Sequence, residues 1–190
     1  MDLRDIGILV GAAVAMLGWI VTRYHALQLA KRKEQLDLVN KRLDEFYGPL
    51  YVATRAGRAA YESLLVQLAI PEGIFAISRT PSIDDLKELH HWMKHVLLPL
   101  NDVIEKAILT SAYLIREEAM PPPLIAYMNH VATTRAVVAY WELGDYAKSS
   151  LPVAYPSELD KYIADSYVAL KAEQLHLIGL TSRSATIVAK

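Results

Sequence analysis

Cysteine is absent from the 190-residue sequence, which excludes disulfide bonds, cysteine-ligated zinc sites and thiol nucleophiles. An excess of one charge is also lacking, because 20 basic and 21 acidic residues give a formal net charge of -1. Nothing in this balance favours nucleic acid, and no nucleic-acid partner is predicted. The sequence also lacks a Gly-x-Ser-x-Gly motif and a glycine-rich phosphate loop, so nucleophilic catalysis has no recognisable motif.

Charge is missing altogether from one stretch near the N-terminus, the 17-residue run from Ile6 to Thr22. This length is at the short end of what crosses a bilayer core of about 30 Å. A cleaved secretory signal is disfavoured, because Asp2 and Asp5 precede the run and the residues after it continue as a helix. A helix that is apolar on every side also fits poorly in the core of a small domain. We therefore predict a retained transmembrane anchor over residues 1–22.

Basic residues lie almost entirely on the C-terminal side of this run, with only Arg4 before it. The positive-inside rule therefore predicts an N-terminus outside the membrane and a protein body in the cytoplasm. The side chains expected at the membrane surface are an interfacial tryptophan and basic residues that attract anionic lipid heads. They are Trp19, Arg23, Lys31, Arg32 and Lys33.

Small residues recur within the run at Gly7, Gly11, Ala15 and Gly18. Spacings of four and seven place them on one helix face, and such a face allows two helix backbones to approach closely in lipid. The alternative is that glycine and alanine are simply common in membrane helices. We predict self-association through this face.

Residues 23–47 are predicted to form a helical stem with a seam of coiled-coil type. Leu29, Leu36 and Leu43 are seven residues apart, Val39 lies between them, and Arg32 interrupts the pattern. The seam has two interpretations, which both stay open: it packs between chains and fixes their number, or it packs on its own bundle.

Residues 48–180 are predicted to form a cytoplasmic bundle of four or more helices, which makes the fold all-α, and residues 181–190 a flexible tail. Gly48 and Pro49 are expected to end the stem helix, since glycine favours a helix C-terminus and proline cannot continue one. The first bundle helix carries a stripe of small residues, including Ala53 and Gly57, that suits close packing against a neighbour. The expected helices span residues 50–70, 83–115 with a kink at Pro99, 123–144 and 157–178.

Two Glu-x-x-His motifs, Glu88–His91 and Glu173–His176, resemble the ligand pairs of di-iron helical bundles. In a simple up-down bundle, however, the two motifs fall at opposite ends. A di-iron enzyme is therefore kept only as a remote alternative, and neither a cofactor nor an enzymatic activity is predicted.

Four stretches of the chain, with a Tyr-Gly-Pro-Leu turn in the first, are LDEFYGPLY, VLLPLN, HVATTRAVVAYWELGDY and YPSELDKYIADSYVALKAEQLHLIGL. They resemble a family of uncharacterised bacterial single-pass membrane proteins, and the Tyr-Gly-Pro-Leu turn is the most specific part of this likeness. The resemblance implies a location at a bacterial inner membrane.

In layout the chain is more distantly similar to the membrane accessory protein of type VI CRISPR systems. That protein has an N-terminal anchor and a HEPN-like helical domain, and it assembles into a pore-like ring. HEPN ribonucleases place an arginine four to six residues before a histidine. Here Arg23 precedes His25 too closely, and His130 comes before Arg135, in the wrong order. The resemblance therefore implies membrane assembly rather than RNA cleavage.

We predict a single-pass membrane protein that self-assembles through its anchor and stem, as a pore-like or membrane-perturbing effector of an anti-phage system. Its expected partners are membrane lipids, further copies of the chain and a protein of the same defence system. The alternative is a monomeric or dimeric membrane-tethered binding module that recruits a cytosolic partner.

Overall fold

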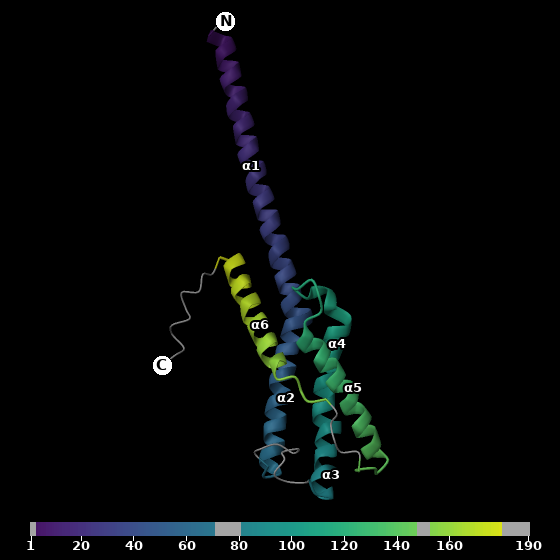
Figure 1. The fold of residues 1–190 in the computed structure, drawn as a ribbon. Coiled ribbons are helices and arrows are strands. Elements are labelled where there is room, and N and C mark those ends of the chain that lie inside the picture. The colour runs from purple at the N-terminus through teal and green to yellow at the C-terminus, as the bar shows by residue number, and fades with distance from the viewer. Residues whose placement is uncertain (1–2, 71–80, 148–152, 180–190) are drawn as a thin grey trace, which may run out of the picture. The chain divides into compact units, whose positions relative to one another are not determined.

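The computed structural model describes residues 3–70, 81–147 and 153–179, although the side chains of residues 3–10, 12 and 13 lie outside this description (Figure 1). Within these ranges all regular secondary structure is helical, which confirms the predicted all-α class. The chain divides into two compact units, Met1–Asn40 with Glu173–Lys190, and Lys41–Ala172. The predicted tail, residues 181–190, lies outside the described residues.

The first unit is built on helix α1, Leu3–Arg42, together with the last turn of helix α6, Glu158–Leu177. Arg32 Nε donates to the carbonyl oxygen of Leu177 at 2.5 Å, and Gln174 Nε2 donates to Asn40 Oδ1 at 2.6 Å. The second half of α1 is thus attached to the end of α6 by polar side chains.

The predicted membrane anchor is not supported by the part of the chain that the structure describes. Among those residues, no helix combines the length and the hydropathy needed to cross a bilayer. The charge-free run begins at Ile6, and within it side chains are described only for Gly11 and for residues 14–22.

The stem helix does not end at Gly48, as the sequence predicted. A wide π-turn, η1 (Leu43–Tyr47), joins α1 directly to α2 (Gly48–Gln67), and Gly48 is right-handed helical with a φ of -65°. The N–H of Gly48 reaches back five residues to the carbonyl of Leu43. Pro49 then occupies the second position of α2. The N–H groups of a helix's first turn have no partner within the helix, so the missing N–H of proline costs no hydrogen bond there. The wide turn therefore allows the helix to pass through a proline.

A wide turn also precedes Pro99. A second π-turn, η2 (Met93–Leu97), joins α3 (Ile83–Trp92) to α4 (Leu98–Ser111), and Pro99 is again the second residue of the following helix. Ser82 begins α3 with a capping box, in which its hydroxyl accepts the N–H of Asp85 and its own N–H donates to the Asp85 carboxylate. A short 3₁₀ turn, η3 (Ala112–Leu114), ends this predicted helix.

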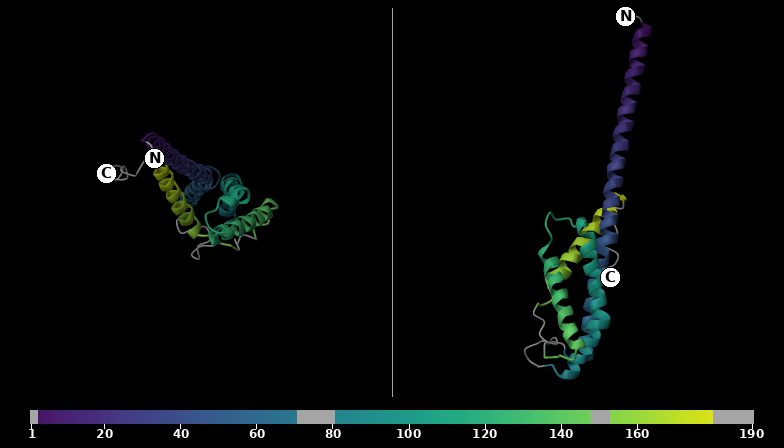
Figure 2. Two further views of the ribbon diagram at one scale, coloured as in Figure 1. Left: turned by 90° about the horizontal axis from the view of Figure 1, so that it is seen from above. Right: turned by 90° about the vertical axis from the view of Figure 1, so that its right-hand side faces the viewer.

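The second unit is completed by α5 (Pro122–Glu142) and the first turns of α6. Helix α2 packs along α4, and α4 contacts α5; Figure 2 shows these helices from two further directions. The rings of Tyr51 and Tyr167 stack at 4.4 Å and connect α2 to α6. A core cluster of buried side chains joins α2, α3, η2 and α5, and it consists of Leu64, Leu86, Leu89, Met93, Val137, Val138 and Trp141.

We expect Gly48→Ala to lower the free energy of unfolding by about 2 kcal/mol. A Cβ at this position would collide with the carbonyl oxygen of Leu43, and backbone atoms cannot move aside cheaply. Chemical denaturation followed by circular dichroism measures the change.

Gly57→Ala is the matched control, because a Cβ at Gly57 would meet nothing within 4 Å. This substitution should raise the free energy of unfolding by about 0.5–1 kcal/mol through helix propensity. If Gly48→Ala also stabilised the protein, the close approach of Gly48 to Leu43 would not constrain the wide turn.

Candidate functional site

The second unit contains a cavity of about 530 Å³, a volume typical of small-molecule sites. Helix α2, the segment from α3 to α4, helix α5 and the residues around the start of α6 all contribute to its lining. Most of the wall is apolar. The apolar lining residues are Ala53, Gly57, Leu89, Met93, Leu97, Ile104 and Ala154.

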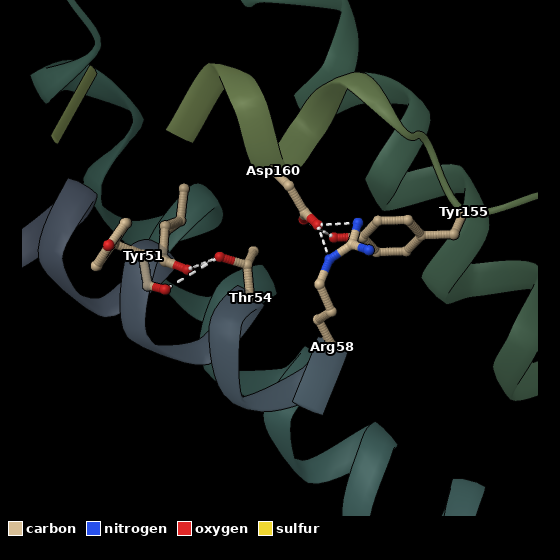
Figure 3. Close-up of polar contacts among 6 residues, drawn as sticks. Tyr51, Thr54, Arg58, Tyr155 and Asp160 are labelled. Atoms are coloured by element: carbon tan, nitrogen blue, oxygen red, sulfur yellow. Dashed lines mark hydrogen bonds and ion pairs between the residues drawn. The ribbon is translucent and has the colours of Figure 1, made fainter. Parts of the chain in front are cut away.

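Three polar side chains converge in the wall of this cavity, as Figure 3 shows. Arg58 of α2 donates from Nε to Asp160 Oδ2 at 2.7 Å, and Arg58 Nη2 lies 2.5 Å from the same oxygen. The hydroxyl of Tyr155 donates to the other carboxylate oxygen, Oδ1, at 2.5 Å. Both oxygens of Asp160 are therefore occupied, and the side chain is held by two distant segments.

The electrostatics of this group keep it neutral overall. The pKa of Tyr155 is raised, first by burial and then by its hydrogen bond to Asp160, so the phenol keeps its proton. The pKa of Arg58 is raised by the hydrogen bond to Asp160, so the guanidinium stays positive. The Arg58 side chain is 52% exposed and that of Asp160 is 19% exposed, so solvent weakens this ion pair to about 1 kcal/mol.

His130 of α5 also lines the cavity and is only 8% exposed. Its Nδ1 donates to the backbone carbonyl of Val153 at 2.9 Å, since a carbonyl oxygen can only accept. In the neutral ring this leaves Nε2 as an acceptor. Among the described residues, Nε2 has no hydrogen-bond partner.

Two other polar groups of the wall are already engaged. Thr54 donates its hydroxyl to the carbonyl oxygen of Leu50 at 2.8 Å (Figure 3), and Asn101 Oδ1 accepts from the Tyr127 hydroxyl at 2.9 Å. Since Asp160 is bound on both oxygens, it is poorly placed to remove a proton from a substrate.

The face of α1 predicted to mediate self-association is not covered by other parts of the chain at the positions whose side chains are described. At Gly11 and Gly18 an added Cβ would meet no atom within 4 Å, and Ala15 is exposed. The side-chain position of Gly7 lies outside the described residues.

The predicted membrane-surface residues divide into two groups. Trp19 is 68% exposed, and Arg23, Lys31 and Lys33 are exposed as well. Arg32 instead uses its guanidinium to bind the end of α6. No pattern in the sequence indicated this role of Arg32.

The predicted seam also divides along its length. Leu29 is 66% exposed and Leu36 is partly buried, whereas Val39 and Leu43 are 2% and 6% exposed. The end of the seam nearest the π-turn is therefore covered within a single chain, and the N-terminal end is not.

The two predicted Glu-x-x-His motifs fall in different units. Glu88 accepts hydrogen bonds from Gln67 and Trp92, and His91 is exposed with its ring against His95. Glu173 and His176 belong to the first unit. Across the described ranges, no three histidine or carboxylate side chains gather in a way that could hold a metal ion.

The Arg58–Asp160–Tyr155 group was missed by the sequence analysis, because Arg58 and Asp160 are 102 residues apart. The one local signal was the stripe of small residues in α2, which predicted close helix packing. At Gly57 that interpretation is wrong, since the position faces open space in the cavity wall.

Comparison of the chain with protein-family models, with curated proteins and with solved structures found no match. The resemblances seen in the sequence therefore stay predictions.

We expect Asp160→Asn to lower the pH at which the Tyr155 hydroxyl loses its proton. The substitution removes the carboxylate that opposes a phenolate and leaves burial and the nearby Tyr127 to raise the pKa of Tyr155. The free energy of unfolding should fall by about 1 kcal/mol through loss of the half-exposed ion pair. NMR titration of ¹³C-labelled tyrosine measures the pKa change, with Tyr155→Phe to assign the resonance.

Asp165→Asn is the control on the same helix, because Asp165 is exposed and pairs with Lys161 instead. It should leave the Tyr155 titration unchanged. An equal titration of Tyr155 in the wild type and in Asp160→Asn would contradict the assigned hydrogen bond.

Proposed function

We propose that the chain is a single-pass membrane protein that self-associates through the first part of α1 and keeps its helical bundle in the cytoplasm. The observation that carries the proposal is the charge-free run from Ile6 to Thr22. Its described apolar side chains are well exposed: Val14, Met16, Leu17, Trp19, Ile20 and Val21, at 49–68%.

These positions are distributed around more than half of the helix circumference, since each residue turns by about 100°, and the remaining face carries Gly11, Ala15 and Gly18. Full burial of one such side chain is worth about 1.5–3 kcal/mol, so exposure of all of them to water is unfavourable. A lipid environment removes that penalty on every side of the helix at once, which a single protein partner would not do. Exposed Arg23, Lys31 and Lys33 then suit the anionic lipid heads on the cytoplasmic side.

Self-association is supported by the open face at Gly11, Ala15 and Gly18. A ring of such helices would perturb or open the membrane. The resemblance to the CRISPR accessory protein adds an anti-phage effector as the biological setting of this proposal.

A membrane-tethered binding module is the second candidate function. Two observations favour it: the cavity of the second unit, and the burial of Val39 and Leu43 within one chain. The second observation leaves less of the seam free to contact another copy.

Membrane insertion is tested by alkaline carbonate extraction of bacterial membranes that contain the full chain. The wild type should stay in the membrane pellet, and Leu17→Lys with Ile20→Lys should move to the supernatant. Each lysine within a span opposes insertion by about 2.5–3.5 kcal/mol. Leu27→Lys with Leu29→Lys is the control, because both positions are exposed but follow the run. A wild-type protein in the supernatant would overturn the membrane proposal.

Self-association is tested separately, by native mass spectrometry of the full chain in mild detergent. We expect a single oligomer that Gly11→Leu with Gly18→Leu reduces to smaller species, because the larger side chains keep the backbones apart. Met16→Leu with Ile20→Leu introduces the same residue on the opposite face and should leave the mass unchanged. A monomeric wild type would favour the tethered binding module.

A further inference from the structure

We propose that the cavity of the second unit binds an uncharged, mainly apolar small molecule that carries a hydroxyl group or a comparable hydrogen-bond donor. The inference goes beyond membrane assembly and concerns only residues of the second unit. Volume, free space, charge balance and one unpartnered acceptor support it independently.

The walls indicate an apolar body for the ligand. Leu89, Met93, Leu97 and Ile104 come from one continuous stretch of α3, η2 and α4, and Ala53 faces the same space from α2. Water against such a surface is displaced favourably when an apolar molecule enters. The cavity of about 530 Å³ is large enough for a molecule rather than a single water.

Gly57 keeps this volume open. It lies in the interior of α2, where glycine is less favourable than alanine. Neither a positive φ nor a close neighbour requires it, because a Cβ there would meet nothing within 4 Å. A larger side chain at this position would extend into the space that the ligand is proposed to fill.

The charges in the wall indicate that the ligand is uncharged. The ionised lining residues are Arg58 and two carboxylates, Glu62 and Asp160. An anionic ligand would approach both carboxylates, while Arg58 is already paired with Asp160. A cationic ligand would have to compete with Arg58 for Asp160, whose two oxygens are both occupied. The other carboxylate, Glu62, is exposed, and solvent weakens any ion pair that it could offer.

His130 supplies the polar anchor. Its ring is fixed by the Val153 carbonyl, and in the neutral ring Nε2 is an acceptor with no protein partner in the described chain. The residue lines the cavity and is 8% exposed, so Nε2 can gain a hydrogen bond from a ligand donor at little cost in ordering, because the ring is already held. A hydroxyl at one end of an apolar body meets this requirement.

The test uses three probes with the same alkyl chain and different head groups: 1-octanol, octanoate and octylammonium. Each is titrated into the full-length protein in detergent micelles, and the His130 ring and Met93 methyl resonances, which both belong to the cavity wall, are followed by NMR. We expect 1-octanol to bind at least tenfold more tightly than either charged probe. Preferential binding of octanoate or octylammonium, or equal binding of all three, would overturn the proposal.

The cavity itself is tested by Gly57→Leu, which should weaken 1-octanol binding at least tenfold. Ala59→Leu places the same side chain on an exposed position of α2 outside the cavity and should bind as the wild type does. The Gly57→Leu protein in identical micelles is also the control for probe that dissolves in the detergent, because its cavity is expected to be filled. Unchanged binding by Gly57→Leu would show that the alcohol binds elsewhere.

Two further variants keep the outcome interpretable. Gly57→Ala should weaken binding by less than Gly57→Leu without loss of helix content, which separates filling of the cavity from unfolding. His130→Leu should weaken 1-octanol binding but leave binding of octane unchanged, and an equal loss for both probes would contradict the role of His130. Gly11→Leu with Gly18→Leu should bind 1-octanol normally, so failure of the assembly proposal is distinguishable from failure of this one.

Discussion

The missing N–H groups of Pro49 and Pro99 are the constraint on which the rest of the second unit depends. Each proline follows a five-residue wide turn, η1 or η2, that lets a helix continue where an ordinary α-turn would break. Each turn packs against the helix that follows the other turn: η1 contacts α4, and η2 contacts α2. Two interrupted helices thereby pack along their length.

The cavity is a product of the same arrangement. Met93 begins η2 and Leu97 ends it, and both line the cavity, so the wide turn supplies part of the apolar wall. Another part of the wall is fixed by the neutral Arg58–Asp160–Tyr155 group, which connects α2 to the start of α6. The hydrogen bonds of this group and the apolar side chains of η2 line one cavity, and no metal ligand set occurs in the described residues.

Local patterns predicted the helices well and the site poorly. The helix starts expected at residues 83 and 123 lie within one residue of the observed starts, Ile83 and Pro122, because capping residues and prolines act within one turn. The end predicted at Gly48 was wrong, because the same two residues that stop an α-helix are accommodated by a wide turn. The pairing of Arg58 with Asp160 depends on tertiary structure across 102 residues, which no spacing in the sequence records.

A wide turn is an α-helix with one residue inserted, so each π-turn takes up one extra residue without rotating the helix that follows it. Deletion of a single residue from Leu43–Tyr47 would restore an ordinary turn and leave the later side chains of α2, Gly57 and Arg58 among them, facing the cavity as before. The ring of Pro49 would then meet a carbonyl oxygen of the preceding turn, a contact that the wide turn avoids. The cost of such a deletion therefore falls on the proline and not on the cavity wall.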